Sequence, residues 1–369
     1  MPFASKVQYV IMKKPQRPSP AIRPPPTPQK HSICRKPALR KAFIPKNVAE
    51  VLNWTTLNLP RSELSLSLTF PTGQTFRWRK TGEQQYTGVV RSHLISLKHL
   101  EQEDGRVAYC LHSSRNADEA ERDLLDFLNS GICMSNLWTE FSASDERFAE
   151  LAWHLGGARV LRQDPLECLM QFLCSSNNGI VRITRMVEYL SGLGNYLGNV
   201  GNFSFYEFPT LELLSQVSEK ELRDAGFGYR ANYIVSTVKG LQSKSGGGVE
   251  WLASLRKSQL KDAIDALLTL KGVGPKVAAC VALFSLDHHD AIPVDTHVWK
   301  VGTTFLLPEV AGTNQTLKQS SRVAEAFVSK YGNYAGWAQN LLFIAELPAQ
   351  KLLLPANLHT AKYKKGLLE

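Results

Sequence analysis

The residue types most suited to chemistry occur in the segment Leu268–Cys280, where a lysine follows a Gly-x-Gly turn. An apolar run ends before the turn, and a proline, which suits the first helical turn, stands after it. The pattern predicts a helix over Ile264–Leu270, a tight turn, and a second helix that starts near Pro275. Glycines let backbone N–H groups approach a phosphate, and the second helix adds the positive end of its dipole. The hairpin could bind a phosphate backbone, although a plain connection between two helices has the same pattern.

Lys276 stands at the start of the second predicted helix, where it could be a Schiff-base nucleophile, a phosphate contact or a solvated lysine. A lysine amine is ordinarily protonated at neutral pH, so a catalytic role requires desolvation or nearby positive charge. A helix N-terminus supplies part of that charge. Cys280 and Phe284 follow four and eight residues later and so share a face with the lysine, a spacing that core packing explains equally well.

Asp295 is the second candidate for chemistry, in the segment Ile292–Trp299. An apolar approach and a proline precede it and a helical pattern follows, so the pattern predicts a helix N-cap. A buried carboxylate there could also stabilise a developing cation and assist proton transfers. Both interpretations remain open from the residues alone.

The elements that must position these residues change character along the chain. From about residue 50 to 115 the apolar period is two, as in Leu64–Phe70, which predicts half-buried strands. After Asp118 the period becomes helical, beginning with Glu119–Leu128, and we expect helices from there to the C-terminus. Glycine-containing breaks between them are expected at Gly156–Gly157, Asn177–Gly179, Gly192–Gly201 and Gly246–Gly248. The sequence predicts an α+β fold. The other expected strands are Phe76–Trp78, Tyr86–Val90, His93–Leu97 and Val107–Leu111.

The N-terminal arm carries the whole charge excess of the chain. Residues 1–49 hold 11 Lys/Arg and no acid, which leaves 32 of the 43 basic residues against all 33 acidic ones. The arm also holds 10 of the 19 prolines, so we expect a disordered basic extension over 1–46. A nuclear address is favoured over an organellar transit peptide, because proline density disfavours the amphipathic helix that such peptides need.

The remaining composition excludes several classes of protein. No stretch of 18 apolar residues occurs and no secretory signal pattern opens the chain, so we expect an intracellular protein without a membrane partner. The six cysteines lack any C-x-x-C pair, which argues against a disulfide framework, a zinc ribbon or a clustered iron–sulfur site.

The hairpin and the Pro293–Asp295 segment resemble the helix–hairpin–helix, Gly/Pro-rich loop and aspartate superfamily of DNA glycosylases, and Lys276 resembles its bifunctional members. Within it the chain resembles the eukaryotic 8-oxoguanine DNA glycosylase/AP lyase family over about residues 50–350. The usual family pattern differs at Lys271, Gly179 and Phe284, where proline, asparagine and methionine are common. Four further segments carry the resemblance: Gly73–Trp78, Cys174–Asn178 with Arg182, Gly226–Arg230, and Gly336–Gln339 with Phe343.

The resemblance implies a role for each matching residue. Lys276 and Asp295 would be catalytic. The Gly73 carbonyl would accept the N7–H of 8-oxoguanine, and Gln339 would read the Watson–Crick edge of a base held between Phe343 and Cys280. Around the base lie the remaining expected pocket residues, Phe284 and Pro293. The expected DNA contacts are Asn177 in the gap left by the base, Arg182 and Arg230 on the orphaned cytosine, Tyr229 as a wedge, and Gly272, Gly274, Val277 and His297.

The resemblance also implies the fold, the reaction and the partner. An antiparallel sheet subdomain like half of the TATA-binding protein, over 47–135, would pack on a helical glycosylase core over 136–350, with the hairpin at about 264–285 and a basic tail over 351–369. A monomer would excise 8-oxoguanine, and formamidopyrimidine, opposite cytosine in double-stranded DNA, and then nick the strand in base excision repair. No cofactor or metal is expected. Two alternatives are a monofunctional alkylated-base glycosylase, which would need no lysine, and a damage-binding protein without catalysis.

Overall fold

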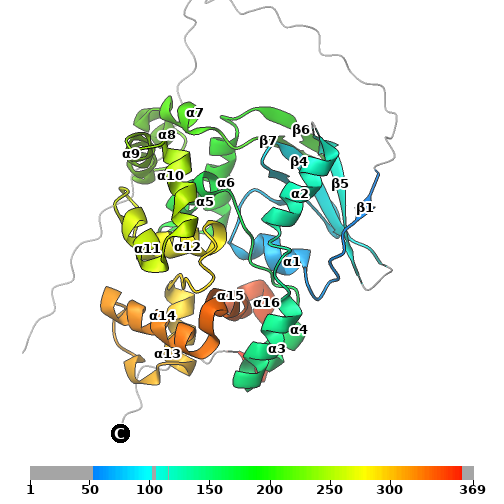
Figure 1. Ribbon diagram of the computed structural model, residues 1–369, viewed down its shortest axis with the longest axis vertical. Helices are drawn as coiled ribbons and strands as arrows, with labels where there is room; N and C mark the ends of the chain where they lie inside the picture. The colour runs from blue at the N-terminus through cyan, green and yellow to red at the C-terminus, as the bar shows by residue number, and fades with distance from the viewer. Residues whose placement is uncertain (1–52, 102–104, 115, 360–369) are drawn as a thin grey trace, which may run out of the picture. The chain divides into compact units, whose positions relative to one another are not determined.

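Five antiparallel strands form the sheet of the N-terminal region, in the order β1-β5-β4-β3-β2 (Figure 1). This computed structural model describes residues 53–101, 105–114 and 116–359. Three of the predicted strands are confirmed, each a little longer than expected, and neighbouring strands pair as hairpins. The strand bounds are Thr55–Thr56 (β1), Arg79–Lys80 (β2), Gln85–Val90 (β3), His93–His99 (β4) and Val107–Ser113 (β5).

The prediction of a strand over Leu64–Phe70 is wrong. The segment forms a short helix, α1 (Leu66–Thr69), followed by a 3-10 turn, η1 (Phe70–Thr72). The N–H of Leu66 donates to the His99 side chain, at Nε2 and 3.2 Å, and so does not pair with the backbone of a neighbouring strand. The leucines alternate because this compact turn is buried on several sides, and not because one face of a strand is buried.

Phe76–Trp78 is also not a strand. The segment is irregular, and the N–H of Phe76 donates to the side chain of Gln171 at 2.7 Å. Phe76 packs edge-on against Phe172 in the helical core, whereas Trp78 stacks on Phe70 in the core of the sheet region. The alternation arises because the segment crosses between two cores.

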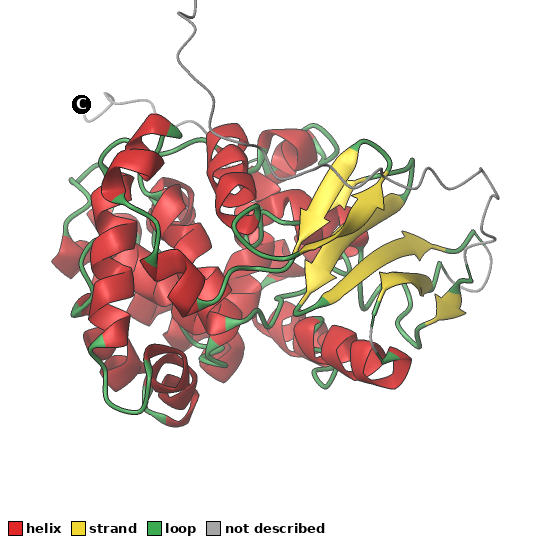
Figure 2. Cartoon of the chain, turned by 90° about the horizontal axis from the view of Figure 1, so that it is seen from above, coloured by secondary structure: helices red, strands yellow, loops and turns green. Residues whose placement is uncertain are grey.

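A second hairpin interrupts the region predicted to be helical, and its first strand lies within the predicted break over Gly192–Gly201. Strands β6 (Tyr196–Val200) and β7 (Phe203–Tyr206) pair across a turn in which Gly201 adopts a left-handed φ of +59°. Such a turn favours glycine because it has no Cβ, so the glycine break encodes a hairpin turn. Phe205 packs with residues of β3 and β4, and Figure 1 shows β6 and β7 beside β4. In Figure 2 the strands gather on one side of the molecule.

Helix α2 (Ala117–Phe127) packs against the sheet and begins two residues before its predicted start. Asn116 determines that start, since its side chain accepts hydrogen bonds from the N–H groups of Asp118 and Glu119. The apolar face of α2 joins the core of the sheet region through Leu124 and Phe127.

The helical core is built around α5, of which ten of eleven residues are buried, and α12 packs directly against it. Among the described residues no helix is both long and apolar enough to span a membrane. The fold class is confirmed as an antiparallel sheet region followed by a helical core. The helix bounds are α3 (Met134–Ser144), α4 (Glu146–His154), α5 (Pro165–Ser175), α6 (Ile180–Ser191), α7 (Leu211–Ser215), α8 (Glu219–Asp224), α9 (Arg230–Gln242), α10 (Gly248–Ser254), α11 (Leu260–Leu268), α12 (Pro275–Ser285), α13 (Thr296–Phe305), α14 (Leu317–Tyr331), α15 (Ala335–Glu346) and α16 (Pro348–Lys351).

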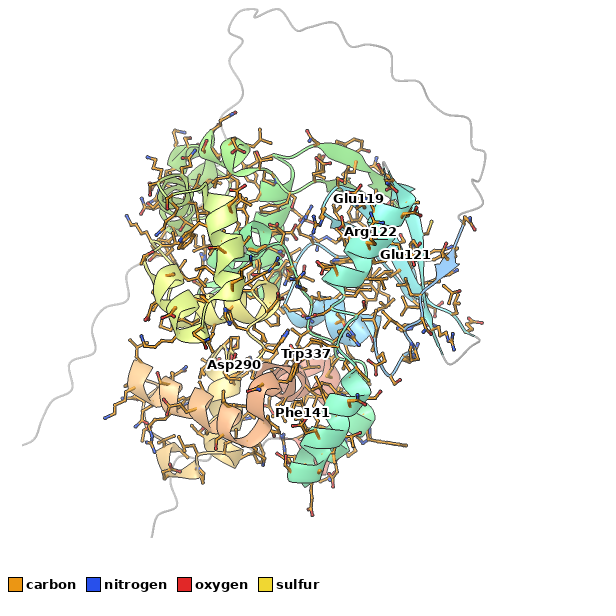
Figure 3. All side chains as sticks on the ribbon, viewed as in Figure 1. Glu119, Glu121, Arg122, Phe141, Asp290 and Trp337 are labelled. Carbon is orange, nitrogen blue, oxygen red and sulfur yellow. The ribbon has the colours of Figure 1, made fainter. Side chains whose placement is uncertain are left out.

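Helices α3 and α4 lie beside the C-terminal helices α14 and α15, far along the chain (Figure 1). Figure 3 labels two of the side chains that fill this part of the core, Phe141 on α3 and Trp337 on α15, and both are at most 1% exposed. One face of α15 packs on α4 and α14, and another face is directed toward α13 and the cavity beside α12.

Candidate active site

The helix–hairpin–helix is formed by α11 and α12, as predicted, although the first helix ends at Leu268. Gly272 has a φ of +91°, and a Cβ there would lie 2.4 Å from the ring of Tyr233, so no other residue fits this turn. Gly274 is the N-cap of α12 and offers no side chain to the first N–H groups of the helix. Those groups and the helix dipole are therefore available to an anion.

Lys276 extends from the first turn of α12 into a cavity between α5, α13 and α15. Its ammonium nitrogen lies 3.5 Å from Ser175 Oγ and 5.2 Å from the ring centre of Phe172. The Ser175 hydroxyl donates to the Phe172 carbonyl at 2.7 Å, so its lone pairs face the lysine. Residues of α5 thus orient the amine that the hairpin presents.

Cys280 and Phe284 occupy the same face of α12 as the lysine, as predicted. The ring of Phe284 stacks on that of Phe172, with centres 5.7 Å apart and planes 11° apart. Burial raises the pKa of the Cys280 thiol to about 11, although the nearby Lys276 charge opposes the shift. The thiol is therefore neutral at pH 7 and presents a soft, uncharged surface to the cavity.

Asp295 is the N-cap of α13, as predicted. One carboxylate oxygen accepts from the N–H groups of His297 and Val298, each at 2.9 Å. The side chain is half-buried and lines the cavity that contains the lysine. A carboxylate and an amine thus share one site, which suits a reaction that passes through a cationic sugar.

Gln339 and Phe343 enter the cavity from one face of α15, four residues apart. Gln339 is 4% exposed, and its side-chain oxygen is buried without a hydrogen-bond partner among the described residues. An orphaned buried acceptor is costly, so this amide is set to bind a polar ligand. The ring of Phe343 makes an edge contact with His297, 5.7 Å between centres.

All eight predicted catalytic and base-pocket residues line this cavity. Gly73 does so with a left-handed φ of +89°, at the end of η1. A Cβ on Gly73 would meet no protein atom within 4 Å, so the glycine is required by its backbone conformation. The complete lining is Thr72, Gly73, Gln74, Phe172, Lys276, Cys280, Phe284, Pro293, Asp295, Val298, Gln339, Asn340 and Phe343.

Asn177 lies in an exposed turn between α5 and α6, with a left-handed φ of +46°. The turn is anchored by the start of α9: the carbonyl of Ser176 accepts from Tyr229 Oη at 3.0 Å and from Arg230 Nε at 3.1 Å. Arg230 also donates to the Asn177 carbonyl at 2.9 Å and is only 2% exposed. The exposed Arg182 donates to the Gly226 carbonyl at 2.9 Å. The structure thus gathers the predicted DNA contacts of this region around one turn, with both arginines bonded to backbone.

Two family descriptions together match most of the described chain. Residues 56–169 match the N-terminal domain of 8-oxoguanine DNA glycosylase, and residues 170–325 match the HhH-GPD superfamily of base excision DNA repair proteins. The chain is 59% identical over 336 residues to N-glycosylase/DNA lyase OGG1 of Arabidopsis thaliana, covering 91% of this chain and 90% of that protein. The chain belongs to the N-glycosylase/DNA lyase family. It is also 32% identical to the N-glycosylase/DNA lyase of Saccharomyces cerevisiae, over 79% of this chain and 85% of that one.

Solved structures agree with the assignment of the chain to this family. The 8-oxoguanine glycosylase/lyase of Clostridium acetobutylicum, in complex with double-stranded DNA containing cytosine opposite 8-oxoG, superposes with a TM-score of 0.67 at 26% identity, over 79% of this chain and 93% of that one. A 3-methyladenine DNA glycosylase from Archaeoglobus fulgidus has the same fold, with a TM-score of 0.62 at 17% identity, over 80% and 98% of the two chains. The family, including its enzymatic activity, is therefore established.

Sequence reasoning missed several residues of this glycosylase/lyase site. Phe172 lies among the buried residues of α5, whose ordinary core pattern carries no sign of a ligand. Ser175 lies in the segment Cys174–Asn178 that carried the resemblance, yet it was given no role. Asn340 and Val298 follow residues that were singled out, yet their own types are unremarkable in sequence. Only the packing of α5 against α12 reveals that Phe172 and Ser175 contact the lysine.

Proposed function

We propose that this glycosylase/lyase excises 8-oxoguanine, and formamidopyrimidine, opposite cytosine in double-stranded DNA, as a step of base excision repair. The observation that carries the proposal is one cavity in which Lys276, Asp295 and the unpartnered Gln339 amide face the same space. The relatives named above as 8-oxoguanine glycosylase/lyase and N-glycosylase/DNA lyase support the substrate and both activities.

The chemistry follows from the two catalytic residues. The neutral amine of Lys276 attacks C1′ of the flipped nucleotide while the glycosidic bond breaks, and the base leaves with the bonding electrons and takes up a proton. Asp295 stabilises the positive charge on the sugar. The bound amine then loses a proton and the C1′–O4′ bond breaks with protonation of O4′, which opens the sugar ring and leaves a Schiff base between lysine and C1′. Loss of a proton from C2′ follows, the C3′–O3′ bond breaks by β-elimination with the phosphate as leaving group, and water hydrolyses the Schiff base to release Lys276.

One of the groups that recognise the lesion, the Gly73 carbonyl, cannot be satisfied by undamaged guanine, which lacks an N7–H. The Gly73 carbonyl accepts the N7–H, Gln339 pairs with the Watson–Crick edge, and Phe343 and Cys280 lie on the two faces of the base. One such hydrogen bond contributes about 1–3 kcal/mol, or roughly 5- to 150-fold. Since a genome offers on the order of 10⁶–10⁹ undamaged competitors, the base opposite the lesion must add selectivity.

The opposite strand is read at the turn around Asn177, whose side chain fills the gap left by the flipped base. Arg182 and Arg230 donate to the estranged cytosine, and Tyr229 wedges beside it. In the hairpin, Gly272, Gly274 and Val277 present backbone N–H groups to a phosphate, with His297 nearby on α13. Both arginines already donate to backbone carbonyls. A guanidinium has five N–H donors, so the exposed Arg182 can donate to the base through its other N–H groups, whereas the buried Arg230 must first become accessible.

The remaining assignments concern organisation and location. A monomer without metal or organic cofactor suffices for this reaction. The sheet subdomain over 47–135 and the core over 136–350 are the functional division we propose, whereas the arm over 1–46 and most of the tail over 351–369 lie outside the described residues. A DNA glycosylase acts where DNA is present, and the proline density of the basic arm favours the nucleus over an organelle.

Incubation with an 8-oxoguanine:cytosine duplex and borohydride tests the function. We expect a covalent protein–DNA adduct with borohydride, and free base plus a nicked strand without it. Base release without adduct or nick would identify a monofunctional glycosylase, and binding without base release would identify a damage-binding protein. Either result would overturn the proposal.

A further inference from the structure

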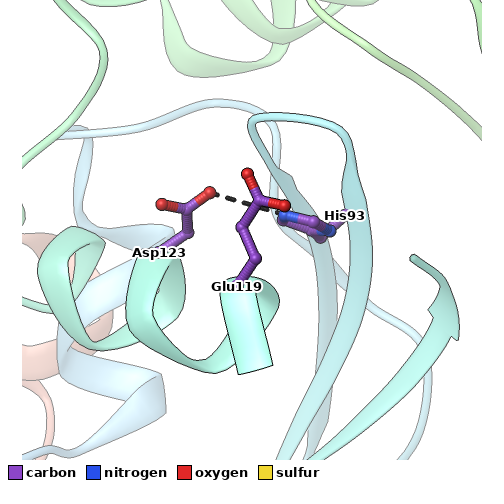
Figure 4. Close-up of side chains that lie close together, drawn as sticks. All are labelled: His93, Glu119 and Asp123. Atoms are coloured by element: carbon purple, nitrogen blue, oxygen red, sulfur yellow. Dashed lines mark ion pairs between the residues drawn. The ribbon is translucent and has the colours of Figure 1, made fainter. Parts of the chain in front are cut away.

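A cluster of one histidine and two carboxylates lies outside the lesion cavity, between the sheet and the helix that packs on it (Figure 4). His93 is the first residue of β4, and Glu119 and Asp123 are four residues apart on α2. One potential ligand atom from each lies within 4.8 Å of the other two. None of the three residues lines the cavity that contains Lys276.

The hydrogen bonds of Ser114 determine which nitrogen of His93 carries a proton. The one hydroxyl hydrogen of Ser114 is donated to the Asn116 carbonyl at 2.8 Å, so its oxygen can only accept from His93 Nδ1, 3.0 Å away. Nδ1 is therefore protonated, and in the neutral ring the lone pair of Nε2 points at the carboxylates. The His93 side chain is only 2% exposed, so water has little access to it.

The distance between Nε2 and the Asp123 carboxylate favours a bridging cation over a hydrogen bond. Nε2 lies 3.4 Å from Asp123 Oδ2, and this buried oxygen has no hydrogen-bond partner among the described residues. A charge-assisted N–H···O bond would be about 2.7–2.9 Å long. By contrast, two ligands of a tetrahedral zinc ion, each about 2.0 Å from the metal, lie roughly 3.3 Å apart.

The surrounding charges suit a cation. Arg91 Nε lies 3.2 Å from the other Asp123 oxygen, Oδ1, and its side chain is largely exposed to solvent, so the pair leaves Oδ2 directed at His93. Glu119 is exposed, so its flexible side chain is able to close the remaining gap to a ligand distance. Three further acids and one arginine on α2 leave the helix negatively charged: Asp118, Glu121, Asp126 and Arg122.

We infer that His93, Glu119 and Asp123 bind a zinc ion, with water as the fourth ligand. One imidazole nitrogen and two carboxylate oxygens form a ligand set that zinc accepts, and the Ser114 hydroxyl supports the histidine from behind. The ion joins the start of β4 to α2 and stabilises the sheet region without taking part in base removal. The sequence does not reveal the site, because 26 positions separate His93 from Glu119.

Zinc titration of the metal-free full-length protein, followed by calorimetry, tests the site. Glu119→Gln is the decisive variant because an exposed residue can be changed without unfolding the protein. Asp118→Asn on the same helical turn removes the same charge outside the cluster and is the matched control. His93→Gln is a second variant, with its fold checked by circular dichroism.

We expect one zinc equivalent to bind to wild type and to Asp118→Asn with the same affinity, at least tenfold weaker binding to Glu119→Gln, and loss of that equivalent in His93→Gln. Excision of 8-oxoguanine should be the same with and without zinc. Equal zinc affinities for wild type and Glu119→Gln would overturn the inference, as would a folded wild-type protein that binds no zinc. ¹⁵N spectra that show both ring nitrogens of His93 protonated at pH 7, before and after zinc addition, would also overturn it.

Discussion

The lesion cavity and the turn around Asn177 differ in whether their polar side chains already have hydrogen-bond partners. In the cavity Lys276 stands on α12, Asp295 caps α13 and Gln339 stands on α15, and the amide oxygen of Gln339 is buried without a hydrogen-bond partner among the described residues. At the turn, Arg182 and Arg230 already donate to backbone carbonyls. The cavity therefore gains hydrogen bonds when it is filled, whereas at the turn the buried Arg230 must shift before it can reach a base. We infer that lesion recognition is preorganised and that recognition of the opposite base requires local rearrangement.

The largest expected effect comes from the residue that both activities require. Lys276→Gln should abolish the borohydride adduct, the excision and the nick, because a Schiff base needs an amine and, among the described residues, no other lysine lines the cavity. Binding to the lesion duplex should persist, since the rest of the cavity is unchanged. An adduct of unchanged yield in this variant would remove Lys276 from the mechanism.

The second largest effect is expected from a substitution that separates the role of Asp295 as a helix N-cap from its role as a catalytic carboxylate. Asn caps helices about as well as Asp, so Asp295→Asn should keep the bonds to His297 and Val298 and change stability little. The loss of charge beside the sugar should slow excision by about 10²- to 10³-fold. Single-turnover rates and thermal unfolding measure the two quantities. A variant that loses stability and rate together would indicate that the residue acts mainly as a cap.

The third test examines the turn through its two arginines. Arg182→Ala and Arg230→Ala should each narrow the rate difference between cytosine and adenine opposite the lesion, by up to about 1–3 kcal/mol. Arg230→Ala should also destabilise the fold by about 1–3 kcal/mol, because two carbonyls lose a buried donor, whereas Arg182→Ala should leave stability nearly unchanged.

Single-turnover excision from both duplexes at one salt concentration, together with thermal unfolding, provides the measurement. Equal losses on the two duplexes would show that the arginines hold phosphate or the turn itself. The comparison between a preorganised cavity and a rearranging turn would then be wrong.

A smaller effect is expected from Gly73→Ala in the cavity. A left-handed φ of +89° should cost roughly 1–2 kcal/mol with a Cβ, although the free protein has space for the methyl group. Excision of 8-oxoguanine should fall to the same extent opposite cytosine and opposite adenine, because Gly73 is assigned to the flipped base alone. A change in the cytosine-to-adenine ratio would show that the two sites are coupled.

The smallest effect on recognition is expected from the arm. Removal of residues 1–46, which carry basic and no acidic side chains, should weaken DNA binding at low salt and reduce its salt dependence. The preference for 8-oxoguanine over guanine should stay the same at fixed salt. Competition binding at two salt concentrations measures both, and an altered lesion preference would contradict this separation of roles.

The sequence alone determined the elements whose signals are local. The spacing of glycine and proline predicted the helix–hairpin–helix. The acid that precedes a helical pattern predicted the N-cap at Asp295. A spacing of four residues placed Gln339 and Phe343 on one face of a helix. Local patterns predicted the wrong secondary structure where a segment is buried on more than one side. Alternation over Leu64–Phe70 was produced by a buried turn, and the glycines after Gly192 hid the β6–β7 hairpin.

Tertiary structure alone decided which of these residues meet. Phe172 and Ser175 contact the lysine because α5 packs on α12, a contact between segments about 100 residues apart. The same is true of the buried Arg230 and of His93 beside α2. Helix propensity, caps and turns act between near neighbours, so a sequence records them directly. Burial, orphaned acceptors and the direction of a side chain depend on packing between distant segments, and these properties decide what the cavity can bind.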